Sequence, residues 1–287
     1  MKKFLAVTIL LIGGISLYLW QTDFRIIKEN ADKFVPESIK QYINPPDIVV
    51  HESPFDTNVV PMDHPLLESV KEGVKSKLQT TLTTNKNVNI FDMTGKTPLM
   101  YAAYKDNPQI VQMLIEAGAD INAKDRWDYT PLMFASKYGS EKVADLLVNK
   151  GADISIKGKD GETAISLASE NGSPSIVNLL TMKGANLSQT NTKGNTPLIT
   201  AAFNGNPQVV ETLLKNGALP NIKNNDGMTA LMVAAEHGRY EAAKILLDKN
   251  ADPYITDNSG KTALDHAMLF GHRNIITLLR QYMKIEE

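Results

Sequence analysis

The side chains best suited to proton transfer or metal binding are five scattered histidines, at His51, His64, His237, His266 and His272. Two of them have a carboxylate beside them in the chain, Glu236 before His237 and Asp265 before His266, which would suit an acid–base pair or a small metal site. No H-x-x-x-H or comparable ligand spacing accompanies them, and the absence of cysteine excludes thiolate nucleophiles and cysteine-ligated zinc. We therefore predict no catalytic residue, no metal site and no cofactor. An enzyme working through His237 and His266 is kept as an alternative.

Composition and charge exclude further classes of function. The chain has 287 residues, of which 43% are apolar and 22% charged, and this is typical of a folded protein. A formal net charge of −2 gives no general attraction to a phosphate backbone, so we predict no nucleic-acid partner. The glycines at 158 and 161 lack the G-x-x-x-x-G-K-S/T pattern of a phosphate loop and are typical of a turn.

The chain begins with two lysines and an uncharged run of 17 residues from Phe4 to Trp20. A signal-peptide core has about 7–15 residues and a spanning helix roughly 20, so residues 1–20 are interpreted as a hydrophobic helix that is either a signal-anchor or a cleaved signal peptide. Lys2 and Lys3 should stay in the cytoplasm, which places the rest of the chain outside. The alternative is a buried helix of a cytosolic domain.

Residues 21–65 differ in composition from the later part of the chain, because prolines cluster there at positions 36, 45, 46, 54, 61 and 65. Each proline removes a backbone donor and favours extended geometry in the preceding residue. We interpret this segment as a spacer between the membrane and the folded part, or as a leader without a role.

A period of 33 residues organises the rest of the chain. A threonine stands at 97, 130, 163, 196, 229 and 262; an alanine follows each by five residues and a glycine precedes each by two, with Asp128 as the one substitute. The glycine suits a tight turn with positive φ, which aspartate tolerates, and the threonine suits a helix N-cap. The alanine leaves room for a second helix, which is apolar at i, i+3 and i+4 and ends at a glycine, or at Asn250 in the fifth unit.

The strings TPLMYAAYKDNPQIVQMLIEAGADIN and TPLMFASKYGSEKVADLLVNKGADIS, which begin at Thr97 and Thr130, resemble ankyrin repeats. The resemblance covers six 33-residue repeats over about residues 92–282, starting near 92, 125, 158, 191, 224 and 257. Extending the period backwards predicts a degenerate N-terminal capping half-repeat over residues 66–91, before the six repeats of residues 92–287. The resemblance implies an all-α ankyrin-repeat solenoid of helix–turn–helix repeats with β-turn or hairpin tips, behind the hydrophobic helix and the spacer.

Ankyrin repeat proteins bind partners on the concave face formed by the turn tips and the first helices. Carried over by position, this implies a partner-binding surface made by Arg126, Trp127, Tyr129, Tyr104, Lys105, Lys137, Tyr138, Lys159, Glu162, Phe203 and His237. The tip of repeat two is the centre of this hypothesis, since Arg, Trp and Tyr dominate interface hot spots. The alternative is that Trp127 folds down onto its own repeat or the next one. Leu269 and Phe270 are interpreted as packing at the C-terminal end.

These observations lead to a non-catalytic protein-binding module, an adaptor or scaffold, that is monomeric and binds a folded protein. We expect it on the outer side of the cytoplasmic membrane, anchored through residues 4–20, with the repeats in the periplasm if the source is a Gram-negative bacterium. Secretion after signal cleavage is the alternative location. The alternative function is an inhibitor or immunity-type protein that blocks a secreted or periplasmic enzyme.

Overall fold

The computed structural model describes residues 5–10, 16–21 and 58–284, in two compact units that divide after Thr57. In the first unit, β1 (Leu5–Leu10) and β2 (Ser16–Gln21) pair antiparallel, with Leu5 opposite Gln21. These residues form strands where we predicted a hydrophobic helix, and β-branched residues such as Val7 and Ile9 favour strands. The other residues of this helix, and spacer residues 22–57, lie outside the described part. Among the described residues, no helix has the length and apolar character needed to cross a membrane.

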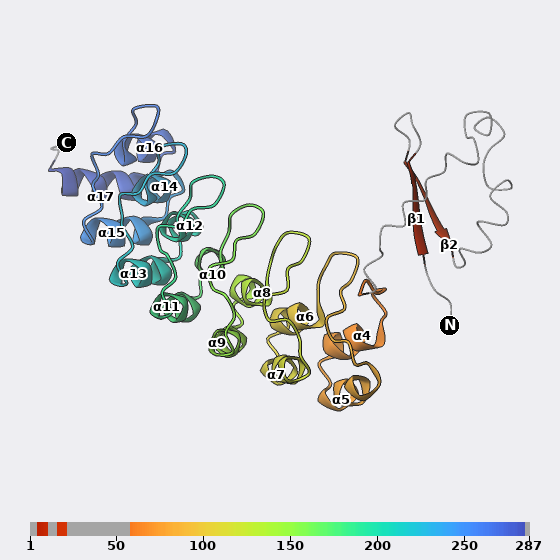
Figure 1. Cartoon of the computed structure of the whole chain (residues 1–287). Coiled ribbons are helices and arrows are strands. Elements are labelled where there is room, and N and C mark those ends of the chain that lie inside the picture. Colours follow the sequence, from red (N-terminus) through yellow and green to blue (C-terminus); the bar gives the residue numbers. More distant parts are fainter. Residues whose placement is uncertain (1–4, 11–15, 22–57, 285–287) are drawn as a thin grey trace, which may run out of the picture. The chain divides into compact units, whose positions relative to one another are not determined.

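The second unit is a stack of helix pairs, seven of them within the residues that the structure describes (Figure 1). The first helices of the pairs are α4 (Pro65–Glu72), α6 (Pro98–Tyr104), α8 (Pro131–Tyr138), α10 (Ala164–Asn171), α12 (Pro197–Asn204), α14 (Ala230–Glu236) and α16 (Ala263–Leu269). The second helices are α5 (Lys75–Thr84), α7 (Pro108–Glu116), α9 (Glu141–Asn149), α11 (Pro174–Met182), α13 (Pro207–Lys215), α15 (Tyr240–Asp248) and α17 (Arg273–Met283). First helices pack against first helices and second against second. The stack curves so that the first helices and the loops before them lie on its inner, concave side (Figure 1).

The helix N-caps and the tight turns form at the residues that the 33-residue period predicts. The Thr97 side chain accepts a hydrogen bond from the Met100 amide, and the five later threonines cap their helices in the same way. Gly95 lies at φ 81° in the tip of repeat one, and Asp128, the one substitute, adopts φ 61° at the same place in repeat two. The predicted turns and N-caps are therefore confirmed.

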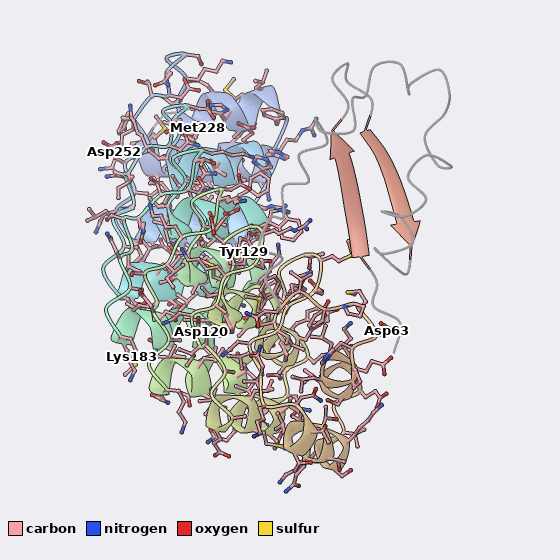
Figure 2. All side chains as sticks on the ribbon, turned by 45° about the vertical axis from the view of Figure 1, so that its right-hand side comes forward. Asp63, Asp120, Tyr129, Lys183, Met228 and Asp252 are labelled. Carbon is pink, nitrogen blue, oxygen red and sulfur yellow. The ribbon has the colours of Figure 1, made fainter. Side chains whose placement is uncertain are left out.

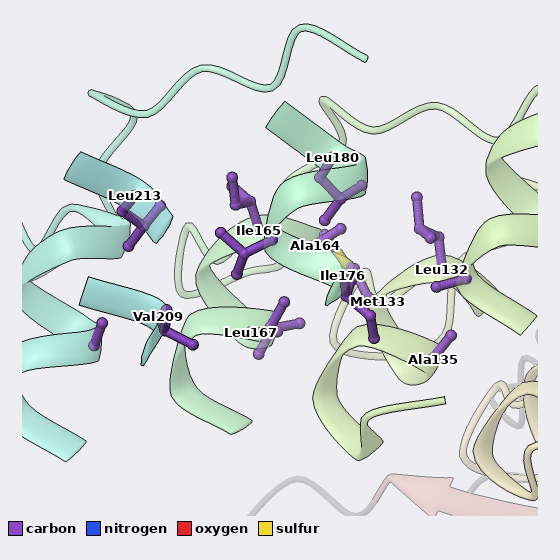
Figure 3. Close-up of a cluster of buried hydrophobic side chains, with 14 of the residues drawn as sticks. Leu132, Met133, Ala135, Ala164, Ile165, Leu167, Ile176, Leu180, Val209 and Leu213 are labelled. Atoms are coloured by element: carbon purple, nitrogen blue, oxygen red, sulfur yellow. The ribbon is translucent and has the colours of Figure 1, made fainter. Parts of the chain in front are cut away.

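The core runs through the middle of every helix pair and is continuous along the stack (Figure 3). Leu132, Ile165 and Leu167 from first helices are almost fully buried, as are Ile176 and Leu180 from a second helix. Each such side chain contributes roughly 1.5–3 kcal/mol by leaving water. The repeated alanines are completely buried, which lets neighbouring helices approach closely.

The segment predicted to be a capping half-repeat, residues 66–91, contains nearly all of α4 and the whole of α5, and Leu66 and Leu78 are fully buried there. At the end of this segment, Phe91 pairs with the last residues of the spacer: the Val60 amide donates to the Phe91 carbonyl and the Phe91 amide to the Asn58 carbonyl, both at 2.8 Å. The end of the spacer is thus part of the folded unit.

Candidate protein-binding surface

Three of the described histidines contact backbone atoms. His64 Nδ1 accepts a hydrogen bond from the Leu66 amide at 3.2 Å and so caps α4, and burial lowers the pKa of His64. His237 Nδ1 lies 3.0 Å from the Val233 carbonyl, and His272 Nε2 lies 2.9 Å from the Glu236 carbonyl. His51 lies outside the described residues.

His266 is buried between two carboxylates from different repeats. Its Nε2 lies 2.9 Å from Asp257 Oδ2, and its Nδ1 lies 3.1 Å from Glu236 Oε2 without hydrogen-bond geometry. Burial alone would raise the pKa of Asp257, but hydrogen bonds from the Lys261 backbone, from the side chain and backbone of Ser259 and from the His266 side chain outweigh it and hold that pKa well below its ordinary value. His266 therefore links repeat five to repeat six. Within the described residues, no group of His, Asp or Glu side chains could hold a metal ion.

The first residue of each tip organises the loop after it. Asp125 Oδ1 accepts hydrogen bonds from the Trp127 amide at 2.9 Å and the Tyr129 amide at 2.8 Å. Equivalent bonds form at Asp92, Asn191, Asn224 and Asp257, whereas Gly158 has no side chain to form them. Backbone bonds also join successive tips, as in Arg126 amide to Thr94 carbonyl and Lys159 amide to Trp127 carbonyl. The tips therefore form a bonded row rather than independent loops (Figure 2, which labels Tyr129 and the equivalent Met228).

Repeat two differs from repeats one and six in the hydrogen bonding of the second carboxylate oxygen, Oδ2, of the aspartate that begins the tip. Asp92 Oδ2 accepts from the Tyr101 hydroxyl at 2.6 Å, and Asp257 Oδ2 is bonded to His266. Nine residues after Asp125, at the position of these donors, stands Phe134. Asp125 is only 6% exposed and its Oδ2 has no hydrogen-bond partner. Burying such a group without a bond costs about 1–3 kcal/mol.

Three aromatic side chains of repeats one and two are exposed. Tyr104, Trp127 and Tyr138 are 44%, 50% and 49% exposed. Tyr104 and Tyr138 meet edge to face at 4.5 Å between ring centroids, and Tyr138 stacks on Phe134 at 6.5 Å. Trp127 thus stays half exposed at its tip. We call Tyr104, Trp127 and Tyr138 the aromatic patch.

Lysines lie over these rings and their neighbours. Lys96 Nζ is 5.9 Å from the Trp127 centroid and 5.7 Å from that of Phe134; Lys105 lies over Tyr104 at 5.6 Å and Lys137 over Tyr129 at 5.2 Å. The surface predicted from the sequence did not include Lys96, Phe134 or Asp125. A side chain that can donate a hydrogen bond stands nine residues after Asp92 and after Asp257. This spacing could have shown from the sequence that Phe134, nine residues after Asp125, cannot donate one.

The other predicted surface residues fall into two groups. Arg126 and Lys159 are exposed at neighbouring tips, whereas Tyr129 is partly buried over Gly158, and burial together with the carboxylate of Glu162 raises the pKa of Tyr129. Glu162 Oε2 is buried without a hydrogen-bond partner. Phe203 of repeat four packs against His237 of repeat five, with 4.5 Å between the ring centroids. The structure thus gathers most predicted residues around repeats one to three and makes the last two a separate pair.

Comparisons with known proteins agree with this architecture. The family model "Ankyrin repeats (3 copies)" matches residues 66–158, 132–224, 165–257 and 217–286. A crystal structure of the ankyrin repeat domain of Bcl-3, described as a unique member of the IkappaB protein family, is similar with a TM-score of 0.67 and 27% sequence identity. The match covers 77% of this chain and 100% of that one. The search of curated proteins gave no match. Together with the repeated helix pairs, these matches show that the chain belongs to the ankyrin repeat family.

Proposed function

We propose that this chain is a non-catalytic protein-binding module whose main contact surface is the aromatic patch on the concave side of repeats one and two. One observation carries the proposal: three aromatic side chains of repeats one and two are each about half exposed, Trp127 at a tip and Tyr104 and Tyr138 in edge-to-face contact at the ends of α6 and α8. Aromatic side chains of this kind dominate the binding energy of protein interfaces. Membership of the ankyrin repeat family supports protein binding as the general role.

The fold does not need these rings on its surface. Repeat three has Asp160, Glu170 and Asn171 at the positions of Trp127, Tyr104 and Tyr138, and the stack continues through it. Grouped apolar exposure on a folded protein marks an interaction surface more often than isolated exposed residues do. A backbone bond between tips fixes the Trp127 main chain, and ring contacts hold Tyr104 and Tyr138, so little ordering entropy would be lost on binding.

The same proposal places the module on the outer side of the cytoplasmic membrane, tethered through residues 4–20 or released by cleavage after them. The order of two lysines followed by an uncharged run supports this location. The structure has short strands at Leu5–Leu10 and Ser16–Gln21. The proposed anchor therefore requires these residues to form a helix when they are in a membrane. Alkaline carbonate extraction combined with the mass of the mature chain tests it. An anchored chain stays in the membrane pellet at full mass, a cleaved chain is soluble and shorter, and a soluble chain of full mass contradicts both forms.

The function itself is tested by capturing partners from the envelope of the source organism with the full chain as bait. The captured protein is then titrated with wild type, Trp127→Ala and the matched control Phe203→Ala, whose ring is 48% exposed in repeat four. We expect Trp127→Ala to weaken binding by at least about 1–2 kcal/mol and the control to leave it nearly unchanged. Equal affinity of all three proteins would contradict the proposed surface.

An activity assay on the captured protein then decides between an adaptor and an inhibitor of the immunity type. An inhibitor abolishes the activity of its target in proportion to occupancy, whereas an adaptor leaves it in place. The half-exposed aromatic side chains of repeats one and two would suit either role.

A further inference from the structure

The lysines over the aromatic rings have no carboxylate partner. Lys96, Lys105 and Lys137 each lie within 6 Å of a ring centroid, and none of them forms an ion pair within the described residues. Exposed Arg126 is also without an ion pair there. A ring face attracts the lysine ammonium group but accepts no conventional hydrogen bond from it. The N–H donors of each lysine therefore remain able to bind an anion.

The acidic residues of the same two repeats do not neutralise this charge. Asp106 and Asp128 are the exposed or partly exposed acids close in sequence, and neither lies within 4.0 Å of a lysine or arginine nitrogen in the described residues. Asp92 and Asp125 are buried and accept hydrogen bonds inside their own tips. Along the tips and first helices of repeats one and two, the aromatic rings therefore stand among more exposed basic than acidic side chains.

The positive surface ends at repeat three. Exposed Asp160 and Glu170 of repeat three stand at the positions of Trp127 and Lys137, and the Lys159 amide donates to the Trp127 carbonyl, so these acids border repeat two. Phosphates of a nucleic-acid strand that followed the row of tips would meet these carboxylates within one repeat, and repulsion there opposes binding. A peptide can avoid this repulsion because its charge can change sign along its length.

We infer, on the basis of the proposed function, that the partner segment lying on repeats one and two is an acidic peptide. Its Asp or Glu side chains bind Lys96, Lys105 and Lys137 while its apolar atoms cover the aromatic patch. Where it continues over Asp160, Glu162 and Glu170 the segment is neutral or basic. Charge complementarity of this kind sets the orientation of the segment and speeds its association.

Peptide display on the full chain tests this inference without a known partner. Random peptides are selected on wild type, and the survivors are titrated against Lys96→Glu/Lys105→Glu/Lys137→Glu and against Lys142→Glu/Lys150→Glu/Lys244→Glu. The control variant carries the same change of charge at exposed lysines of α9, its C-cap and α15, none of which lies over a ring. Labelled oligothymidylate is titrated in parallel as the nucleic-acid probe.

We expect selected peptides to contain an excess of Asp and Glu, to bind the first variant about tenfold or more weakly, and to bind the control variant nearly as well as wild type. Binding should also weaken as salt rises. Peptides without an acidic excess, an equal loss in both variants, or tighter binding of oligothymidylate would overturn the inference.

Titration against Trp127→Ala separates this inference from the proposed function. Neutral or basic peptides that lose affinity for Trp127→Ala would refute the acidic partner and leave the aromatic patch as the binding surface. Peptides that bind wild type, Trp127→Ala and the charge-reversed variant equally would refute both.

Discussion

Repeat two and repeat six begin with an aspartate in the same place and differ in how they complete its bonding. In both tips, one carboxylate oxygen accepts hydrogen bonds from the loop backbone. The second oxygen of Asp257 is bonded to His266, whereas Phe134 stands at the equivalent place in repeat two and leaves Asp125 Oδ2 without a partner. Repeat six is therefore completed by its own side chains. Repeat two retains an unused acceptor beside the exposed ring of Trp127.

Exposed apolar area alone does not separate the two repeats. Leu269 and Phe270 are 63% and 52% exposed, about as much as Trp127. Our prediction that they pack at the C-terminal end was wrong, because they lie at the end of α16 without a later first helix against them in the described chain. Repeat two differs in combining exposed rings with lysines that form no ion pair within the described residues, and this combination favours it as the binding surface.

Among the variants that test this comparison, we expect His266→Ala to lower the free energy of unfolding most. The change leaves Asp257 Oδ2 and Glu236 without their shared partner and opens a cavity, so the free energy of unfolding should fall by about 2–4 kcal/mol. Since terminal repeats of a solenoid can unfold separately, hydrogen exchange in α16 and α17 should be measured together with urea unfolding.

Phe134→Leu is the matched control for that change. Repeat three has Leu167 at this position, and no carboxylate loses a partner, so the cost should be about 1 kcal/mol. If the two variants are equally destabilised, the His266 contacts contribute nothing beyond packing.

A smaller contrast is expected from replacing each aspartate by asparagine. Asn191 and Asn224 occupy this position in repeats four and five, so Asp125→Asn should change stability by less than about 0.5 kcal/mol, whereas Asp257→Asn should cost about 1–2 kcal/mol at neutral pH. Because folding lowers the pKa of Asp257, its ionised form stabilises the native state above its ordinary pKa of 3.8. This stabilisation is lost as the pH falls through the lowered value.

Wild type and Asp257→Asn should therefore differ most near neutral pH and converge as the pH falls below about 4. Urea unfolding followed by helix circular dichroism at several pH values measures both effects. A difference that stays constant down to the acid transition would show that the ionised carboxylate is not what stabilises repeat six.

Phe134→Tyr should make repeat two resemble repeat one. The added hydroxyl can donate to Asp125 Oδ2 as Tyr101 donates to Asp92, which should raise the free energy of unfolding by about 1 kcal/mol. The reverse change, Tyr101→Phe, should lower it by a similar amount. No gain in the first variant would mean that Asp125 Oδ2 is already satisfied in solution.

The smallest effect on stability is expected from Trp127→Ala. Its ring is half exposed and its contact with Lys96 is worth about 1 kcal/mol or less, so stability should fall by less than about 1 kcal/mol. Phe270→Ala, with similar exposure in repeat six, is the control. A loss above about 2 kcal/mol for Trp127→Ala alone would identify Trp127 as a structural residue rather than a contact residue.

Much of the fold could be predicted because its signals are local. The spacing of Thr97 and its equivalents predicted the helix starts, and Asp128 was recognised as the substitute for a glycine at positive φ. The N-terminal run was harder, since length and hydropathy alone do not separate a helix from two apolar strands. Among the predicted contact residues, Trp127, Tyr104 and Tyr138 are exposed and Phe203 pairs with His237, but their role in binding stays a prediction.

The sequence by itself determined the repeat, its period, its caps and its tips, because a cap or turn depends on residues within about four positions of one another. Only the tertiary structure decided which polar groups are satisfied. Asp125 is left without a second bond by Phe134, nine residues away across a loop and a helix, and His266 is held by Glu236 of the preceding repeat. Such pairings depend on residues that only the packed helices bring together, and so the groups left unbonded are decided only once the stack is folded.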